Sequence, residues 1–183
     1  MPPPTPYKSS KPSSQIPNHE TLQPFSFYLL VSLASCSRPD TVFEGTLDFP
    51  SGEWLRFEPQ QITAQIPNAD DCYEIHLSAI IDTAVYHQPA LPVTIKITSP
   101  AGEKRTLFAD LLLQARDGHS LGQPVNGHTS TSLQFSQRIR EYFYFNQPGD
   151  HTVSIGQRTS RYQIQGIRQV QFTIRKAKLE YPK

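Results

Sequence analysis

Three side chains of types that commonly ligate metal ions, Asp117, His119 and His128, lie in one polar stretch of the sequence, residues 116–128. Carboxylates and imidazoles are the oxygen and nitrogen ligands of zinc sites. Their spacing fits no known metal loop, however, and the glycines and the asparagine around them are ordinary turn residues. A surface loop is therefore predicted here, with a metal site as the alternative. No metal and no other cofactor is expected.

The rest of the chain offers little catalytic chemistry. It contains no H-E-x-x-H or C-x-x-C motif and no phosphate-binding glycine loop. Basic and acidic residues nearly balance, with 17 Lys+Arg against 16 Asp+Glu. A balanced charge gives no electrostatic case for nucleic acid as a ligand. The protein is therefore expected not to be an enzyme and not to bind nucleic acid.

Cys36 follows a leucine and two small residues, in the order Leu33-Ala34-Ser35-Cys36. This order resembles the bacterial lipobox, in which the cysteine thiol receives a diacylglycerol and the small residues let a peptidase approach the backbone. The apolar run before it, residues 25–34, is too short for a membrane-spanning helix, which needs about 20 residues. Its length is that of a signal-peptide core, about 7–15 residues. Cys36 is therefore the predicted lipidation site, with a buried strand that ends in a structural cysteine as the alternative.

The second cysteine, Cys72, has two possible roles. If Cys36 carries lipid, Cys72 is left without a disulfide partner. The alternative is a Cys36–Cys72 disulfide in an oxidising compartment. Both accounts are compatible with the sequence.

Aromatic residues of two kinds alternate in Tyr142-Phe143-Tyr144-Phe145. On a strand the phenylalanines share one face, where they would fill a core, and the tyrosines share the other. Packing of both tyrosines inside the sandwich, with their hydroxyls at solvent, is favoured, because aromatic residues are common in strands for packing reasons alone. The alternative is an exposed platform that stacks on a sugar ring or on a partner protein. The candidate partner-binding residues on this strand are Arg138, Arg140, Tyr142 and Tyr144.

Alternation of apolar and polar residues predicts the strands that position these groups. Every second residue is apolar over most of residues 73–79, 93–98, 152–155 and 169–175, as half-buried strands require. Turn residues separate these runs. Residues 107–115 fit either a strand or a short helix, and residues 159–166 are predicted to cross between strands. The predicted fold is all-β, a single antiparallel β-sandwich that is jelly-roll-like, with a core that contains Ile75, Leu77, Val93, Ile95, Val153, Ile155, Val170 and Phe172.

The first part of the chain has the composition of a segment that does not fold by itself. Seven prolines precede Cys36, and Ser, Thr, Gln and Asn fill most of the gaps between them. Such a segment cannot bury enough apolar surface to offset the entropy of ordering. Residues 1–35 are therefore predicted to be a disordered leader plus a lipoprotein signal peptide. Residues 36–41 are then a lipid-anchored linker, residues 42–177 the β-sandwich and residues 178–183 a tail.

Further landmarks follow the lipobox-like segment in order: a lone Trp54, the predicted strand 73–81, Tyr86, Leu107-Phe108-Ala109-Asp110, and the ending Gly166-Ile167…Val170…Ile174-Arg175-Lys176. Over about residues 36–176 this order resembles the GldH-type gliding-motility lipoproteins of the Bacteroidetes. The resemblance implies an envelope lipoprotein, anchored through Cys36, that belongs to or descends from the gliding machinery. In that family the motor assembly is linked to secretion of surface proteins. No catalytic residues are implied.

Two functions from different classes therefore remain open. The first is a lipid-anchored, non-enzymatic component of a gliding or surface-secretion assembly, whose sandwich binds envelope protein partners. The second is an envelope-anchored carbohydrate-binding module that uses Tyr142, Tyr144 or Trp54. An exposed row of coplanar aromatic rings would favour the second function. In both cases the expected location is the cell envelope, with a lipid on Cys36 as the contact to the membrane.

Overall fold

The computed structural model describes residues 40–178, and the regular elements of this range are all β-strands. In chain order the strands are β1 (Thr41–Asp48), β2 (Glu53–Leu55), β3 (Gln60–Ile66), β4 (Tyr73–Asp82), β5 (Ala90–Thr98), β6 (Lys104–Leu112), β7 (Gln123–Pro124), β8 (Ser132–Phe143), β9 (Gly149–Gln157), β10 (Gln163–Gln165) and β11 (Ile167–Lys176). Within the described range, no helix is long and apolar enough to cross a membrane.

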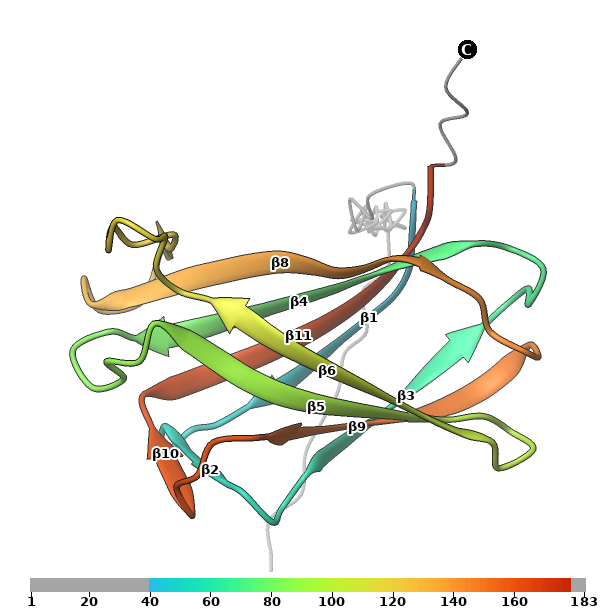
Figure 1. Ribbon diagram of the computed structural model, residues 1–183, viewed down its shortest axis with the longest axis horizontal. Helices are drawn as coiled ribbons and strands as arrows, with labels where there is room; N and C mark the ends of the chain where they lie inside the picture. The colour runs from blue at the N-terminus through green and yellow to red at the C-terminus, as the bar shows by residue number, and fades with distance from the viewer. Residues whose placement is uncertain (1–39, 179–183) are drawn as a thin grey trace, which may run out of the picture. The chain divides into compact units, whose positions relative to one another are not determined.

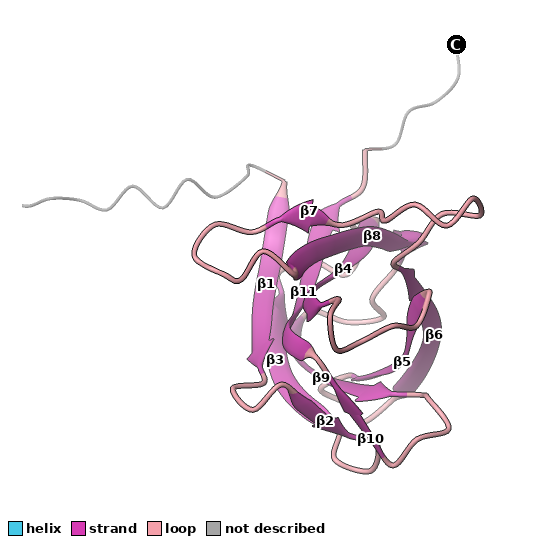
Figure 2. Ribbon diagram, turned by 90° about the vertical axis from the view of Figure 1, so that its left-hand side faces the viewer, coloured by secondary structure: helices cyan, strands magenta, loops and turns pink. Residues whose placement is uncertain are grey.

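Two antiparallel sheets face each other across a shared interior (Figures 1 and 2). One sheet has the strand order β1-β11-β4-β8-β7 and the other has the order β3-β9-β5-β6, while β10 pairs with β2. The first strand thus lies beside the last, and most successive strands of the chain switch from one sheet to the other. Eight long strands connected in this way make a jelly roll. The predicted jelly-roll-like β-sandwich is therefore confirmed.

The interior holds the apolar members of the alternating runs. All eight predicted core residues are buried, each with an exposed fraction of 0%. Ile95 of β5 shows the arrangement, because it lies in register with Ile155 of β9 on one side and with Leu107 of β6 on the other. Full burial of a side chain of this size stabilises the fold by about 1.5–3 kcal/mol. The polar residues that alternate with them on β5, Thr94, Lys96 and Thr98, are half-buried or exposed.

The pairing of strands shows the secondary structure of two segments for which the sequence pattern gave either two alternatives or only a general description. Residues 107–115 lie mainly in strand β6, which pairs along its whole length with β5. Leu107 and Leu111 both point into the core from this strand, so partner strands override the helical spacing of the leucines. Residues 159–166 cross between β9 and β11 as predicted, and the crossing also contains the short strand β10.

Candidate functional site

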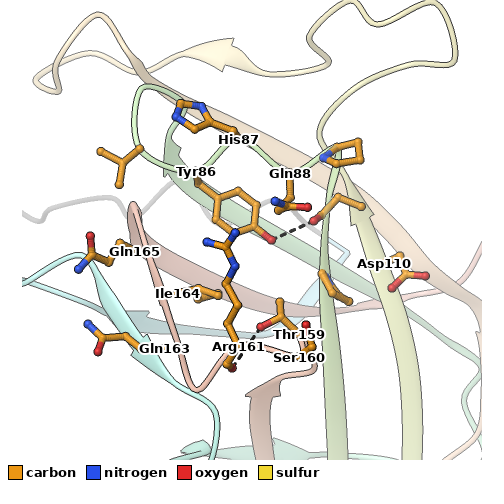
Figure 3. Close-up of a pocket in the computed structure, with 14 residues that line it drawn as sticks. Tyr86, His87, Gln88, Asp110, Thr159, Ser160, Arg161, Gln163, Ile164 and Gln165 are labelled. Atoms are coloured by element: carbon orange, nitrogen blue, oxygen red, sulfur yellow. Dashed lines mark hydrogen bonds between the residues drawn. The ribbon is translucent and has the colours of Figure 1, made fainter.

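A pocket of about 870 Å³ lies where the turn between β4 and β5 meets the segment that leads from β9 into β10 (Figure 3). Its lining is largely polar and includes Gln88, Asp110, Thr159, Arg161 and Gln163. Sites for small ligands occupy about 300–1,000 Å³ and bind through a few well-placed polar groups. The volume and lining of this pocket therefore suit a small polar ligand.

Tyr86 forms a buried part of the pocket wall. Its hydroxyl donates a hydrogen bond to the carbonyl oxygen of Ala90 at 2.9 Å (Figure 3). Burial raises the pKa of Tyr86 to about 12, although the positive charge of Arg161 acts in the opposite direction. The hydroxyl therefore stays protonated near neutral pH and ties the wall together, which makes it unsuited to act as a base.

Arg161 supplies an uncompensated positive charge to the pocket. Its side chain extends toward the ring of Tyr86 (Figure 3), and no hydrogen bond or ion pair joins its guanidinium to another described residue. Asp110, by contrast, is paired with Arg158 at 2.8 Å. A guanidinium among neutral amides and hydroxyls is suited to hold a carboxylate or a phosphate. Among the described residues of the pocket, no hydroxyl is hydrogen-bonded to a histidine or a carboxylate.

Asp82, buried at the end of β4, holds the turn that carries Tyr86. Its carboxylate accepts hydrogen bonds from the backbone N–H of Ala84 at 3.1 Å and from Arg168 Nη2 at 3.3 Å. A hydrogen bond from the Thr131 hydroxyl contributes most to lowering the pKa of Asp82, and the bonds from Ala84 and Arg168 add to it against the opposing effect of burial. Asp82 is therefore ionised, and its carboxylate holds together the residues behind the pocket wall.

Gly166 brings the other wall of the pocket against this turn. The backbone N–H of Asp82 donates to the carbonyl of Gly166 at 2.7 Å, and the N–H of Tyr86 donates to the carbonyl of Asp82 at 2.9 Å. Gly166 has a φ of 88°, and a Cβ added there would lie 3.0 Å from both Asp82 O and Tyr86 N. Any side chain at this position would thus combine backbone strain with a steric clash.

Replacing Asp82 with asparagine should lower the free energy of unfolding by about 1–3 kcal/mol at neutral pH, because a buried charged hydrogen-bond acceptor is lost. Since the folded-state pKa of Asp82 is lowered, the stabilisation is complete above the unfolded-state value of about 3.9 and disappears as the pH falls through the folded-state value. Urea unfolding at pH 7 and at successively lower pH measures both effects. The gap between wild type and Asp82→Asn should narrow on acidification.

Asp48 provides the matched control for this experiment. It is exposed, and its carboxylate accepts one hydrogen bond, from Gln169. Asp48→Asn should stay within about 0.5 kcal/mol of wild type at every pH. An Asp82→Asn protein with wild-type stability at pH 7 would contradict the stabilising role of the Asp82 carboxylate.

The tyrosines and phenylalanines near the end of β8 lie on opposite sides of the chain. Phe143 and Phe145 are buried and contact each other edge to face at 4.9 Å, so the prediction that they fill the core is confirmed. Tyr142 and Tyr144 are 56% and 52% exposed. The favoured prediction that both tyrosines pack inside the sandwich is therefore wrong. The reason is that the phenylalanines already occupy the inward positions of this stretch.

The two predicted arginines also lie at the surface, but their surroundings differ. Arg138 pairs with Glu74 at 3.1 Å and with Glu141 at 3.1 Å, whereas Arg140 is exposed and has no ion pair with a described residue. The β4–β8 pairing shifts register twice next to these arginines, so simple alternation does not place their side chains. The structure brings Arg138, Arg140, Tyr142 and Tyr144 into one exposed stretch, and their role in partner binding stays a prediction.

The histidine-containing segment lies between β6 and β8 and is largely exposed, as predicted, but it also contains the short strand β7. His119 contacts Asp117 within the loop, and residues 40–178 contain no group of three side chains arranged to hold a metal ion. The same segment contains a G-x-S-x-G pattern, at residues 118–122. That pattern signals a nucleophile only at a strand-to-helix turn. No described helix follows Ser120, whose hydroxyl instead accepts a hydrogen bond from Gly122 N at 3.2 Å.

The remaining candidate residues have different outcomes. Trp54 is only 1% exposed and its ring lies 5.0 Å from that of Phe49, so it cannot form a platform for sugars and that prediction is wrong. Cys72 is buried and forms no disulfide with a described residue. Cys36 lies outside the described residues, and its lipidation stays a prediction.

Sequence reasoning did not identify Asp82, Gly166 or the pocket beside them. One signal was available, since an aspartate and a threonine end the apolar strand 73–81 and a proline follows at Pro89, which is typical of a turn held by a side chain. The contact of Asp82 with Gly166 depends on the pairing of β4 with β11, and that pairing is not visible in the sequence.

Comparison with known families agrees with this architecture. The family model described as GldH lipoprotein matches residues 41–174, a range that begins with β1 and extends into β11. No curated protein matches the chain. The family match covers well over half of the chain and includes both sheets. The protein therefore belongs to the GldH lipoprotein family.

Proposed function

We propose that this protein is a lipid-anchored, non-enzymatic component of a gliding or surface-protein secretion assembly, and that it binds a protein partner through the exposed end of β8. Membership of a lipoprotein family supports attachment to an envelope membrane. The single observation that supports the binding surface is the exposure of Tyr142 and Tyr144 beside an arginine, Arg140, that has no ion pair with a described residue. Tyrosine and arginine are enriched at the centres of protein interfaces.

The tyrosines are well placed for binding because their backbone is already held. Phe143 and Phe145 anchor the stretch in the core. Beyond β8, the carbonyl oxygen of Tyr144 accepts a hydrogen bond from Arg105 Nη1 at 2.7 Å, which ties this end of β8 to strand β6. Exposed tyrosines on a rigid segment lose little conformational entropy when a partner covers them.

A lipid anchor would strengthen such a contact without enlarging the interface with the partner. Confinement to a membrane raises the effective concentration of neighbouring envelope proteins, so a modest affinity is sufficient.

Arg138 would support the proposed binding surface on β8. Although burial opposes ionisation of Glu74, hydrogen bonds from His76 and Arg138 lower its pKa overall. The Glu74–Arg138 pair therefore stays charged near neutral pH and keeps this part of the surface ordered.

Replacing Tyr142 and Tyr144 together with alanine should reduce capture of the partner by at least tenfold, since interface tyrosines commonly contribute more than about 1 kcal/mol each. The test is a quantitative pull-down from detergent-solubilised envelopes, with the captured proteins identified by mass spectrometry. Proteins of the gliding or surface-secretion assembly should be captured by wild type and lost by the double variant.

Tyr162→Ala is the matched control, because Tyr162 is an exposed tyrosine on another part of the chain, 63% accessible. It should capture the same proteins as wild type. Equal capture by the Tyr142/Tyr144 variant would contradict the proposal. If that variant keeps its protein partners but loses binding to a glycan array, the carbohydrate-binding function should replace this one.

A further inference from the structure

A second hollow, of about 400 Å³, lies over the solvent-facing side of the sheet β3-β9-β5-β6. Its floor consists of Gly156 and Ser154 of β9 with Thr94 and Lys96 of β5, which lie in register as the pairs Gly156–Thr94 and Ser154–Lys96. The alternate residues of both strands point into the core. Gly156 itself is buried, and Pro59 lies over the place that a side chain there would occupy. We call this hollow the β9 groove.

Aromatic side chains border the β9 groove and are exposed to an unusual degree. Phe57 lines it and is 72% exposed, with the ring of Tyr162 at 6.0 Å. On the other side Phe108, 68% exposed, lies in register with Thr94. An arginine lies against each phenylalanine ring, Arg56 at 5.5 Å from Phe57 and Arg158 at 5.7 Å from Phe108. Two phenylalanines held in place at the surface next to one hollow indicate a binding site.

The charge of the β9 groove is positive. Three cations line it, Arg56, Lys96 and Arg158. Only Arg158 has a carboxylate partner among the described residues, Asp110. Lys96 and Arg56 are therefore available to an anionic ligand, and the hydroxyl-bearing residues Thr94 and Ser154 line the same hollow.

We propose that the β9 groove binds an acidic polysaccharide, a chain of sugar rings that carry carboxylates. A sugar ring presents an apolar face that can rest on Phe57 or Phe108, and hydroxyls that can exchange hydrogen bonds with Thr94 and Ser154. Its carboxylate can pair with Lys96 and Arg56. An apolar peptide fits less well, because the floor offers glycine, hydroxyl groups and a lysine where an apolar anchor would need a hydrophobic pocket.

The test measures binding of the detergent-solubilised full chain to polygalacturonate and to alginate by biolayer interferometry. Fully methyl-esterified polygalacturonate is the matched neutral ligand, and polyphosphate is a polyanion without sugar rings. Wild type should bind at least one of the two uronate chains. It should bind the methyl ester and polyphosphate at least tenfold more weakly, and rising salt should weaken the uronate complex.

Variants of exposed groove residues should weaken uronate binding without loss of the fold. Phe57→Ala and Lys96→Gln should each cost about tenfold in affinity. Tyr142→Ala on the opposite sheet is the control and should bind like wild type.

Each alternative outcome would overturn the proposal in a recognisable way. Equal binding of polyphosphate would show a general cationic surface, and equal binding of the methyl ester would exclude a role for carboxylates. Loss of binding in Tyr142→Ala together with normal binding in Phe57→Ala would move the site to β8. Failure of wild type to bind either uronate chain would refute the proposal and leave the protein-partner function of β8 untouched.

Discussion

Replacing Ile95 with aspartate is expected to prevent folding of the sandwich altogether. Ile95 has an exposed fraction of 0% and lies in the middle of β5, between β9 and β6. Its cross-strand neighbours Ile155 and Leu107 are both apolar and buried. An unpaired carboxylate in such surroundings costs several kcal/mol, and a domain of this size has only about 5–15 kcal/mol to lose.

The neighbouring residue provides the control for this prediction. Lys96 is exposed on the opposite side of the same strand, so Lys96→Asp places the same new side chain one position along, in solvent. Lys96→Asp should unfold within a few degrees of wild type, while Ile95→Asp should show no cooperative transition in circular dichroism. Equal thermal stability of the two variants would mean that the strand register is shifted by one residue.

Much of the fold could be predicted from the sequence because the strands are half-buried. In β5 the residues Val93, Ile95 and Ile97 are buried while Lys96 is exposed. The same alternation of apolar and polar residues is present in the amino-acid sequence. The same period predicted the inward phenylalanines Phe143 and Phe145. Where a strand is covered on one side only, local pattern and tertiary position agree.

The misplaced residues are those whose position depends on neighbours that the pattern does not reveal. Whether Tyr142 faces solvent depends on which face of β8 meets the second sheet, and Trp54 is buried because Phe49 and the core cover it. The pocket beside Asp82 needs β4, β11 and the crossing 159–166 to meet. The β9 groove likewise joins the segment before β3 with β5 and β9, which are far apart in the chain.

Replacing Cys36 with serine is expected to move the protein from the membrane fraction to the soluble fraction. Serine keeps the size of the side chain but cannot form the thioether to diacylglycerol. Each CH₂ group buried in a bilayer contributes about 0.8 kcal/mol, and stable anchoring needs two acyl chains. Fractionation of envelopes followed by immunoblotting measures the shift.

Cys72→Ser distinguishes the anchor from the disulfide account. Cys72 is buried and has no disulfide partner among the described residues, so its serine variant should stay in the membrane fraction like wild type. If both serine variants instead showed the same loss of stability under oxidising conditions and both remained in their wild-type fraction, a Cys36–Cys72 disulfide would explain Cys36 and the anchor would be refuted.

The mass of the N-terminal peptide of the native protein tests the lipoprotein account most directly. The protein is purified from membranes with detergent, and its N-terminal peptide is analysed by mass spectrometry. The account predicts that the mature chain begins at Cys36 and that this residue carries a diacylglyceryl group, with a further acyl chain on the new amine. A soluble mature protein that still begins with Met1 and has an unmodified Cys36 would contradict it.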